Sequence, residues 1–366
     1  MSFISKIKTG NERYPALTGI RAMGAMIVFF DHFPFSPNSH IRINVLAFFF
    51  VLSGFLIVRL YYNKIEQPGK NMRIYFINRF ARIYPVYFLL LTVAVLLRHD
   101  FRLWLLIKNY TLTHAFVNNE NDFIIPPSWS LTVEECFYFL APFIIFFIKR
   151  FNFLTAFIFA SVLLGLALLI ARPDILLFRN AAFVFSTTFF GHFAEFYAGV
   201  YLALIMIKKE QKGIIEIKGL RWTLTGAAGV AALIIAMGYV YAYPPPDTTK
   251  IIIINNFLIP VPIAILYYGL MCENSMASRI LSAKWPGILG RSSYTFYLLH
   301  TIIIYSLAMP YLLPYFGSYY VVCSVLTCVV TWFISIAIFV FYEEPLNLFI
   351  RKKFITKENT KPSLPM

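Results

Sequence analysis

The sequence predicts an all-α protein, a polytopic membrane bundle of about ten transmembrane helices with both termini in the cytoplasm. Of its 366 residues, 59% are hydrophobic and only 13% are charged, whereas a soluble domain carries roughly 25% charged residues. The apolar runs are long and unbroken, unlike the alternating segments of about ten residues in a membrane barrel. The 39 Phe, 23 Tyr and 5 Trp are typical of helices with aromatic residues at the lipid interfaces.

Ten apolar segments are long enough to cross a bilayer. They cover about residues 15–33, 44–62, 83–97, 130–148, 151–170, 181–207, 222–243, 251–271, 292–309 and 318–341. The 32 Lys and Arg outnumber the 17 Asp and Glu and concentrate in every second loop, which is typical of cytoplasmic loops. This distribution predicts the orientation and argues against nucleic acid as a partner.

One membrane domain is expected over residues 1–346, followed by a basic cytoplasmic tail over 347–366 that is too short to bury a core. The longest segment on the outer side covers about 98–129. Its amphipathic part, Phe101 to Ile107, is expected to lie along the membrane interface.

The four cysteines lie in or beside apolar runs without metal-ligand spacing, so neither disulfides nor a metal site is expected. Arg21 and Asp31 interrupt the first apolar run, and no small-residue cleavage site follows. A retained first span is therefore favoured over a signal peptide.

The first span is the main candidate for chemistry because it holds Arg21, Asp31 and His32 in an otherwise apolar helix. A charge at mid-bilayer costs roughly 2.5–3.5 kcal/mol on insertion scales, so such residues usually face a water-filled or substrate-filled interior. The spacing of Arg21 and His32 returns them to nearly the same helical face, roughly 16 Å apart. The alternative is that Arg21 snorkels to the interface while Asp31 and His32 cap the helix.

Two arginines, Arg79 and Arg82, share a helical face at the cytoplasmic mouth of the third span. Guanidinium groups in pairs suit bidentate capture of phosphates. Simple anchoring by the positive-inside rule is the alternative.

On the outer side, the segment from Trp129 to Glu135 brings two carboxylates into an apolar span. Thr132 and Glu135 have the spacing of a capping box, which gives Glu135 a structural explanation. Glu134 has none, and it is the better functional candidate.

Two other groups have structural interpretations. His192 and Glu195 share a helical face and are expected to form hydrogen bonds between helices, since too few further ligands accompany them for a metal. His300 and the Glu343-Glu344-Pro345 end of the last span are expected to pack or to cap.

Seven motifs in the same order resemble the acyltransferase 3 family of integral-membrane acyltransferases, as a stand-alone member without a fused esterase-like domain. They are Leu17-Thr18-Gly19-Ile20-Arg21-Ala22 with His32 following, Phe48 to Ile57, Arg79-x-x-Arg82-Ile83-Tyr84-Pro85, Trp129 to Glu134, Glu195-Phe196-x-x-Gly199, Ser293 to His300, and Glu343-x-Pro345. One departure is Thr18, where the family usually has aspartate.

The resemblance implies transfer of an acyl group, commonly acetyl from acetyl-CoA, to a carbohydrate hydroxyl on the far side of a bacterial inner membrane. Acyl-CoA, the carbohydrate and the lipid bilayer are then the expected partners, and no permanently bound cofactor is expected. The acceptor, the length of the acyl group and the oligomeric state are left open by the sequence.

The topology suggests how the residues divide the work. Arg21, Arg79 and Arg82 are expected to bind the donor phosphates, and His32 is expected to be the general base. Glu134, or else Asp31, would orient the imidazole of His32. A transient acyl-histidine is an alternative. Residues expected to contact the acceptor or to support the site are Trp129, Ser130, Tyr297 and His300.

Two functions of other classes are also consistent with intramembrane charges. A secondary transporter would use them as a substrate or ion pathway, although the sequence has no convincing inverted repeat. A non-catalytic component of a polysaccharide-assembly complex is the second alternative.

Overall fold

The computed structural model describes residues 14–33, 41–65, 72–116, 123–171, 178, 180–213, 219–242, 247–316 and 319–355. These residues form helices and connecting turns, with no strand in the described ranges. The helices are α1 (Pro15–His32), α2 (Ile41–Tyr61), α3 (Met72–Arg98), α4 (Leu103–Tyr110), η2 (His114–Phe116), η4 (Pro126–Ser128), α5 (Trp129–Arg150), α6 (Phe153–Ile170), α7 (Ala181–Thr187), α8 (Phe189–Gln211), α9 (Arg221–Ala242), α10 (Thr248–Ile252), η5 (Ile253–Leu258), α11 (Pro260–Cys272), α12 (Met276–Leu281), α13 (Lys284–Ile303), η6 (Ile304–Leu312), α14 (Leu313–Phe316), α15 (Tyr320–Ile338), η7 (Phe339–Glu343) and α16 (Glu344–Ile355).

The polytopic helical bundle predicted from composition is confirmed. Within the described ranges, eight helical stretches are long and apolar enough to cross a membrane, and a shorter apolar helix covers Val45–Tyr61. The one expected segment that remains is the first in the sequence, and it forms α1, which contains the ionisable residues Arg21, Asp31 and His32. One face of α1, which includes Leu17, Ala25 and Phe29, is buried in the bundle, whereas Met23, Ile27 and Phe30 on another face are exposed.

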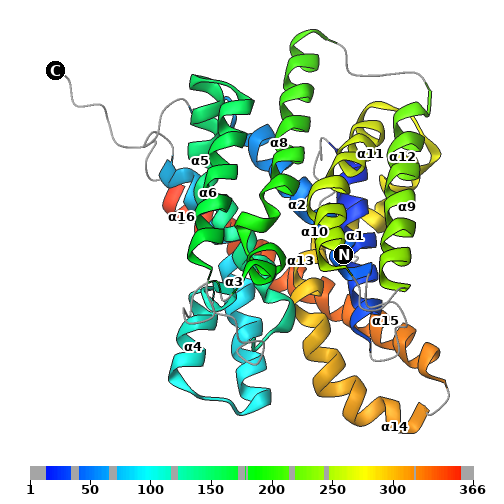
Figure 1. The fold of residues 1–366 in the computed structure, drawn as a ribbon. Coiled ribbons are helices and arrows are strands. Elements are labelled where there is room, and N and C mark those ends of the chain that lie inside the picture. Colours follow the sequence, from blue (N-terminus) through cyan, green and yellow to red (C-terminus); the bar gives the residue numbers. More distant parts are fainter. Residues whose placement is uncertain are drawn as a thin grey trace.

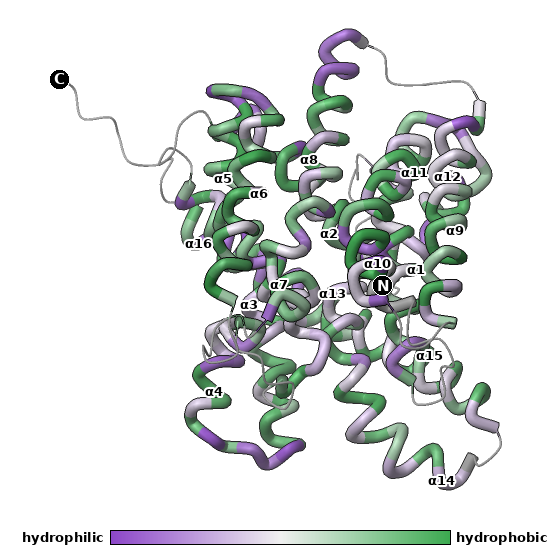
Figure 2. Tube along the Cα trace, in the orientation of Figure 1, coloured by the Kyte–Doolittle hydropathy of each residue, from purple (hydrophilic) through white to green (hydrophobic). Residues whose placement is uncertain are grey.

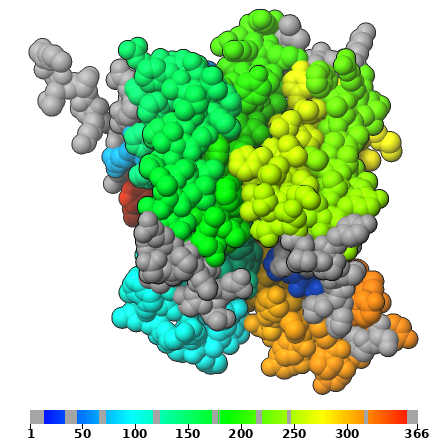
Figure 3. Space-filling view, viewed as in Figure 1, coloured from blue at the N-terminus to red at the C-terminus, as the bar shows by residue number. Residues whose placement is uncertain are grey.

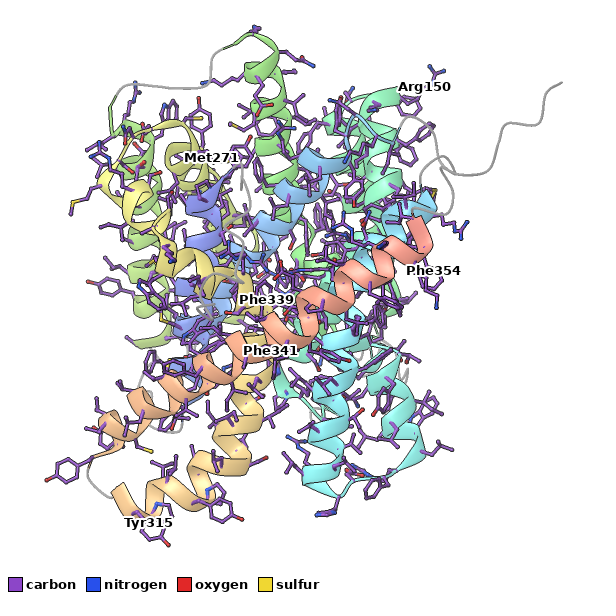
Figure 4. All side chains as sticks on the ribbon, turned by 180° about the vertical axis from the view of Figure 1, so that it is seen from behind. Arg150, Met271, Tyr315, Phe339, Phe341 and Phe354 are labelled. Carbon is purple, nitrogen blue, oxygen red and sulfur yellow. The ribbon has the colours of Figure 1, made fainter. Side chains whose placement is uncertain are left out.

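The connections alternate between two ends of the bundle (Figure 1). Arg150 and Met271 lie at one end, whereas Tyr315 lies at the other (Figure 4). This alternation agrees with the loops that the sequence assigned to opposite sides. Hydrophilic residues collect at the end of α8 and around α4, while the helix middles are mostly hydrophobic (Figure 2).

Helix α4 forms part of the outer segment identified from the sequence. Leu103, Trp104 and Ile107 are exposed, whereas Leu105 is buried. The helix therefore has one apolar face turned outward and one turned toward the bundle, as expected for a helix along an interface.

The basic tail expected from residue 347 is helical at first, because α16 continues to Ile355. Residues 356–366 lie outside the described ranges. Helices α15, η7 and α16 form one continuous helical stretch that crosses the back of the bundle obliquely (Figure 4).

Helices α2 and α8 touch backbone to backbone at two glycines. A Cβ atom on Gly54 would overlap the carbonyl oxygen of Phe196, and one on Gly199 would overlap the carbonyl oxygen of Val51. Only glycine permits so close an approach. Since Ser53 precedes Gly54, this contact also fixes where the Ser53 side chain enters the interior.

Candidate active site

The interior polar site begins with an ion pair between distant parts of the chain. Arg82 of α3 donates to Glu343 of η7 at 2.8 Å, and the hydroxyl of Thr295 donates to the other carboxylate oxygen at 2.6 Å. Glu343 is buried, whereas about 30% of the Arg82 side chain is exposed. The π-helical turn of η7 places this glutamate toward α3 and α13. Glu343 is therefore part of the site, although capping or packing was expected for it.

Glu134 lies in the same polar interior. Its carboxylate accepts hydrogen bonds from Ser53 at 2.7 Å and from the hydroxyl of Tyr138 at 3.4 Å. It also interacts electrostatically with Arg21 and Arg79. Glu134 thus lies among the arginines, and its expected role as the partner of His32 stays a prediction.

Arg79 is held by aromatic rings. Its guanidinium lies 5.8 Å from the ring centroid of Tyr61 and 5.6 Å from that of Tyr138. Its Nε atom is buried without a hydrogen-bond partner among the described residues. A buried guanidinium with an unused donor is suited to bind an anion.

Arg21 connects α1 to this cluster. It interacts electrostatically with Arg82, Glu134 and Glu343, so the structure brings the three expected donor arginines to the same interior. Arg21 also lines a cavity of about 220 Å³ at the Pro15 end of α1. The other lining residues are Tyr14, Leu17, Thr18, Leu52, Leu56, Arg59 and Leu60.

Arg59 is a site residue that sequence reasoning missed. It pairs with Glu210 of α8, and the hydroxyl of Tyr14 donates to the same carboxylate at 2.8 Å. In the sequence, Arg59 is one of many basic residues at a helix end, and only the cavity distinguishes it from the others.

His32 lies at the opposite end of α1 from this cavity. Its Nδ1 atom is 2.8 Å from the carbonyl oxygen of Val28. Because a carbonyl only accepts, Nδ1 of the neutral ring carries the proton, and Nε2 carries the lone pair. In this tautomer the basic nitrogen of the ring is Nε2. Asp31 is half-buried on the same last turn.

The ring that faces His32 belongs to His300. The two ring centroids are 5.0 Å apart, with 74° between the planes. His300 is fully buried and its Nδ1 donates to the carbonyl oxygen of Tyr297 at 2.6 Å. Its Nε2 atom has no hydrogen-bond partner among the described residues.

Ser130 and Tyr297 connect the two ends of the site. Their hydroxyl oxygens are 2.7 Å apart, and each also lies within hydrogen-bond distance of the carbonyl oxygen of Pro127, at 3.0 Å and 3.1 Å. The ring of Tyr297 lies 5.8 Å from that of His300. Glu134 is one helical turn along α5 from Ser130.

Trp129 packs elsewhere, with its ring 5.9 Å from that of His192. His192 contacts Glu195 at 3.1 Å and the carbonyl oxygen of Ser186 in α7 at 3.1 Å. His192 thus forms the hydrogen bond between helices that its sequence position suggested.

The capping box expected for Thr132 and Glu135 is wrong. Helix α5 already begins at Trp129, so Thr132 lies inside it. Glu135 instead accepts a long hydrogen bond of 3.5 Å from Tyr84. The Pro126–Ser128 turn starts the helical conformation earlier than the spacing of the sequence indicated.

The fold and site define an integral-membrane protein with an arginine-rich interior at one end of α1 and an imidazole pair at the other. Residues 14–336 match the acyltransferase 3 family, which is described as an acyltransferase domain. The chain belongs to this family.

Among curated relatives, the O-acetyltransferase OatA of Staphylococcus aureus strain NCTC 8325 / PS 47 is 27% identical over 328 residues, covering 81% of this chain and 52% of OatA. OatA of strain COL gives the same values. An uncharacterized protein of Haemophilus influenzae strain Rd is 28% identical over 116 residues, covering 26% of this chain and 46% of the relative. The chain spans about half the length of the curated relatives it matches. No solved structure matches it.

Proposed function

We propose that this chain is a membrane O-acyltransferase that moves an acetyl group from cytoplasmic acetyl-CoA to a hydroxyl of a carbohydrate on the other side of the membrane. One observation carries the proposal. A single helix, α1, presents Arg21 to an arginine-rich interior and His32 to an imidazole pair at its opposite end. Donor and acceptor then approach from opposite sides, as the sequence suggested.

The arginine end suits the donor. The phosphates of CoA are polyanionic, and guanidinium groups suit them. Arg21 and Arg59 line the cavity at the Pro15 end of α1, and Arg79 shares with Arg21 the electrostatic interaction with Glu134. Arg82 supports this end through its ion pair with Glu343. The roughly 16 Å between Arg21 and His32 is comparable with the reach of a pantetheine arm, so the thioester would lie near the imidazole pair.

The imidazole end suits the chemistry. Nε2 of His32 removes the proton from the acceptor hydroxyl while the oxygen attacks the carbonyl carbon of the thioester. The carbon–sulfur bond breaks as the tetrahedral intermediate collapses, and the CoA sulfur leaves with the proton from His32. The edge-to-face contact of His300 helps to hold the His32 ring, and the Ser130–Tyr297 hydroxyl pair faces the acceptor.

Acetyl is proposed as the acyl group because the S. aureus relatives are O-acetyltransferases by name. The carbohydrate acceptor follows from the family. The motifs and the arginine cluster favour a phosphate-containing donor over the alternative of a transporter with an ion pathway.

The test is acetyl transfer by the purified chain in bilayer nanodiscs, with [¹⁴C]acetyl-CoA and a panel of oligosaccharides. Wild-type protein is expected to transfer label, and His32→Ala is expected to lose roughly 10²–10⁴-fold in rate, the usual contribution of a general base. His99→Ala is the matched control because His99 is exposed in the turn after α3. Transfer by His32→Ala at the wild-type rate would overturn the assignment.

A further inference from the structure

A second cavity lies apart from the arginine interior, between α8, α9 and α11. It has a volume of about 350 Å³ and is lined by Ala198, Tyr201, Leu202, Ile205, Trp222, Val261, Ala264, Ile265 and Tyr268. Its lining shares no residue with the cavity beside Arg21. The volume is within the range of roughly 300–1,000 Å³ typical of ligand sites. The proposed acyl transfer makes no use of it.

The cavity is apolar and opens at the side of the bundle. Tyr201 is 53% exposed and Val261 is 55% exposed, whereas Leu202 and Tyr268 are buried. In Figure 3 the surface of α8 is set back beside the yellow α11. An apolar recess that opens sideways between membrane-spanning helices faces lipid chains rather than water.

Two cations mark one end of this recess. Lys209 donates to the hydroxyl of Tyr268, and its Nζ lies 4.7 Å from the ring centroid. The guanidinium of Arg221 lies 5.6 Å from the ring centroid of Trp222. Trp222 and Tyr268 contact each other edge to face at 5.4 Å. Aromatic residues beside basic ones are typical of the level of lipid headgroups.

The carboxylates near this end are engaged by other groups. Glu210 bonds to Arg59 and Tyr14, and Glu273 accepts hydrogen bonds from the N-terminal turn of α9. In the described part of the chain, the contacts of Lys209 and Arg221 are with aromatic rings and the Tyr268 hydroxyl, and neither forms an ion pair. Their positive charges are therefore available to an anionic ligand.

We propose that this recess binds an anionic phospholipid, with an acyl chain between α8, α9 and α11 and the phosphate at Lys209 and Arg221. The apolar lining accounts for the chain, and the charges account for the headgroup. Lys209 lies in the last turn of α8 and Arg221 begins α9. The positive-inside pattern assigns this end of the two helices to the cytoplasm, where the leaflet carries anionic lipids and attracts basic residues.

The experiment measures binding to the purified full chain in neutral detergent by native mass spectrometry. The probes are dioleoyl phosphatidylglycerol, dioleoyl phosphatidylcholine and glycerol 1-phosphate. Phosphatidylglycerol is expected to bind more tightly than phosphatidylcholine, and glycerol 1-phosphate is expected not to bind. Lys209→Gln is expected to weaken phosphatidylglycerol binding about fivefold, and the double variant with Arg221→Gln roughly twentyfold.

Lys353→Gln is the matched control. Lys353 of α16 also lies over aromatic rings, 5.7 Å from the Phe349 centroid and 5.6 Å from that of Phe354, but it does not line the recess. The Lys353→Gln variant should bind phosphatidylglycerol as tightly as wild-type protein does. An equal loss in this control would indicate a general effect of surface charge and overturn the proposal.

Ala264→Phe tests the acyl chain separately because it fills the recess without changing charge. It is expected to reduce phosphatidylglycerol binding. Three further results would overturn the proposal: unchanged binding by the Lys209→Gln/Arg221→Gln variant, equal binding of phosphatidylcholine, or equal binding of glycerol 1-phosphate, which would indicate a phosphate site only. The readout is lipid binding and no variant alters Arg21 or His32, so the result is independent of acyl transfer.

Discussion

The imidazole rings of His32 and His300 meet edge to face with 5.0 Å between their centroids, and His300 donates from Nδ1 to the carbonyl oxygen of Tyr297. This donation leaves a lone pair on Nε2 of a buried ring beside the proposed base. We therefore propose that His300, contributed by α13, positions the His32 ring through this ring contact.

We expect His300→Phe to lower kcat for acetyl transfer by about tenfold or more, since the His32 ring loses its polar neighbour. KM for acetyl-CoA should stay within about twofold because the donor site is at the other end of α1. The pH profile of kcat should shift as well. If the pH dependence of kcat had the same midpoints and the same maximum as in wild-type protein, His300 would have only a packing role.

The Glu134→Gln variant distinguishes two possible roles of Glu134, which are to balance the charges of Arg21 and Arg79 or to orient the imidazole of His32. If it balances Arg21 and Arg79, the variant should change KM for acetyl-CoA and lose about 2 kcal/mol of stability, because its hydrogen bond with Ser53 no longer involves a charge. The acidic limb of the kcat pH profile should remain where it is in wild-type protein. A shifted limb would instead make Glu134 the partner of His32.

The ion pair of Arg82 and Glu343 predicts an unequal response to substitution. Arg82→Gln leaves a buried carboxylate without its cation and should cost about 3 kcal/mol. Glu343→Gln should cost less, since the partly exposed Arg82 can reach water. The double variant should be more stable than Arg82→Gln alone, as measured by thermal unfolding in detergent. Equal losses for the two single variants would contradict this.

Glu273, between α11 and α12, predicts a pH dependence of stability. Burial raises the pKa of this carboxyl, but hydrogen bonds from the amides of Trp222 and Thr223 and from the Thr223 hydroxyl outweigh it and lower the pKa below its ordinary value. A depressed folded-state pKa stabilises the fold above the unfolded-state pKa of about 4.3 and ceases to do so as the pH falls through the folded-state value.

The free energy of unfolding of wild-type protein should therefore be about 2 kcal/mol larger than that of Glu273→Gln at pH 7. The difference should shrink as the pH falls below about 4.3. Thermal unfolding of both proteins between pH 7 and pH 3 measures it. A difference that grows toward low pH would contradict the assignment.

Gly54→Ala tests the contact between α2 and α8. The added Cβ would overlap the carbonyl oxygen of Phe196, so the yield of folded protein should fall sharply. Gly165→Ala in α6 is the control, since nothing lies near its added methyl group, and it should be neutral or stabilising by up to about 1 kcal/mol. Similar yields of both variants would show that the contact between α2 and α8 tolerates a side chain at position 54.

The fold class could be predicted from the sequence because apolar length and charge distribution are local properties of each segment. The candidate residues on α1 and α3 could be found for the same reason, since a charge in an apolar helix is conspicuous. Their partners could not. The bond of Ser53 with Glu134 and the pair of Arg82 with Glu343 join residues far apart in the chain, and they depend on which helices pack together.

The backbone contact of α2 with α8 restricts how the bundle can open. No side chain lies between Gly54 and Phe196 or between Gly199 and Val51, so no rotamer change there can act as a gate. These two helices form a fixed frame, and Ser53 holds Glu134 against it. Any passage that admits donor or acceptor to the interior must open where helices meet through movable side chains, as around the cavity beside Arg21.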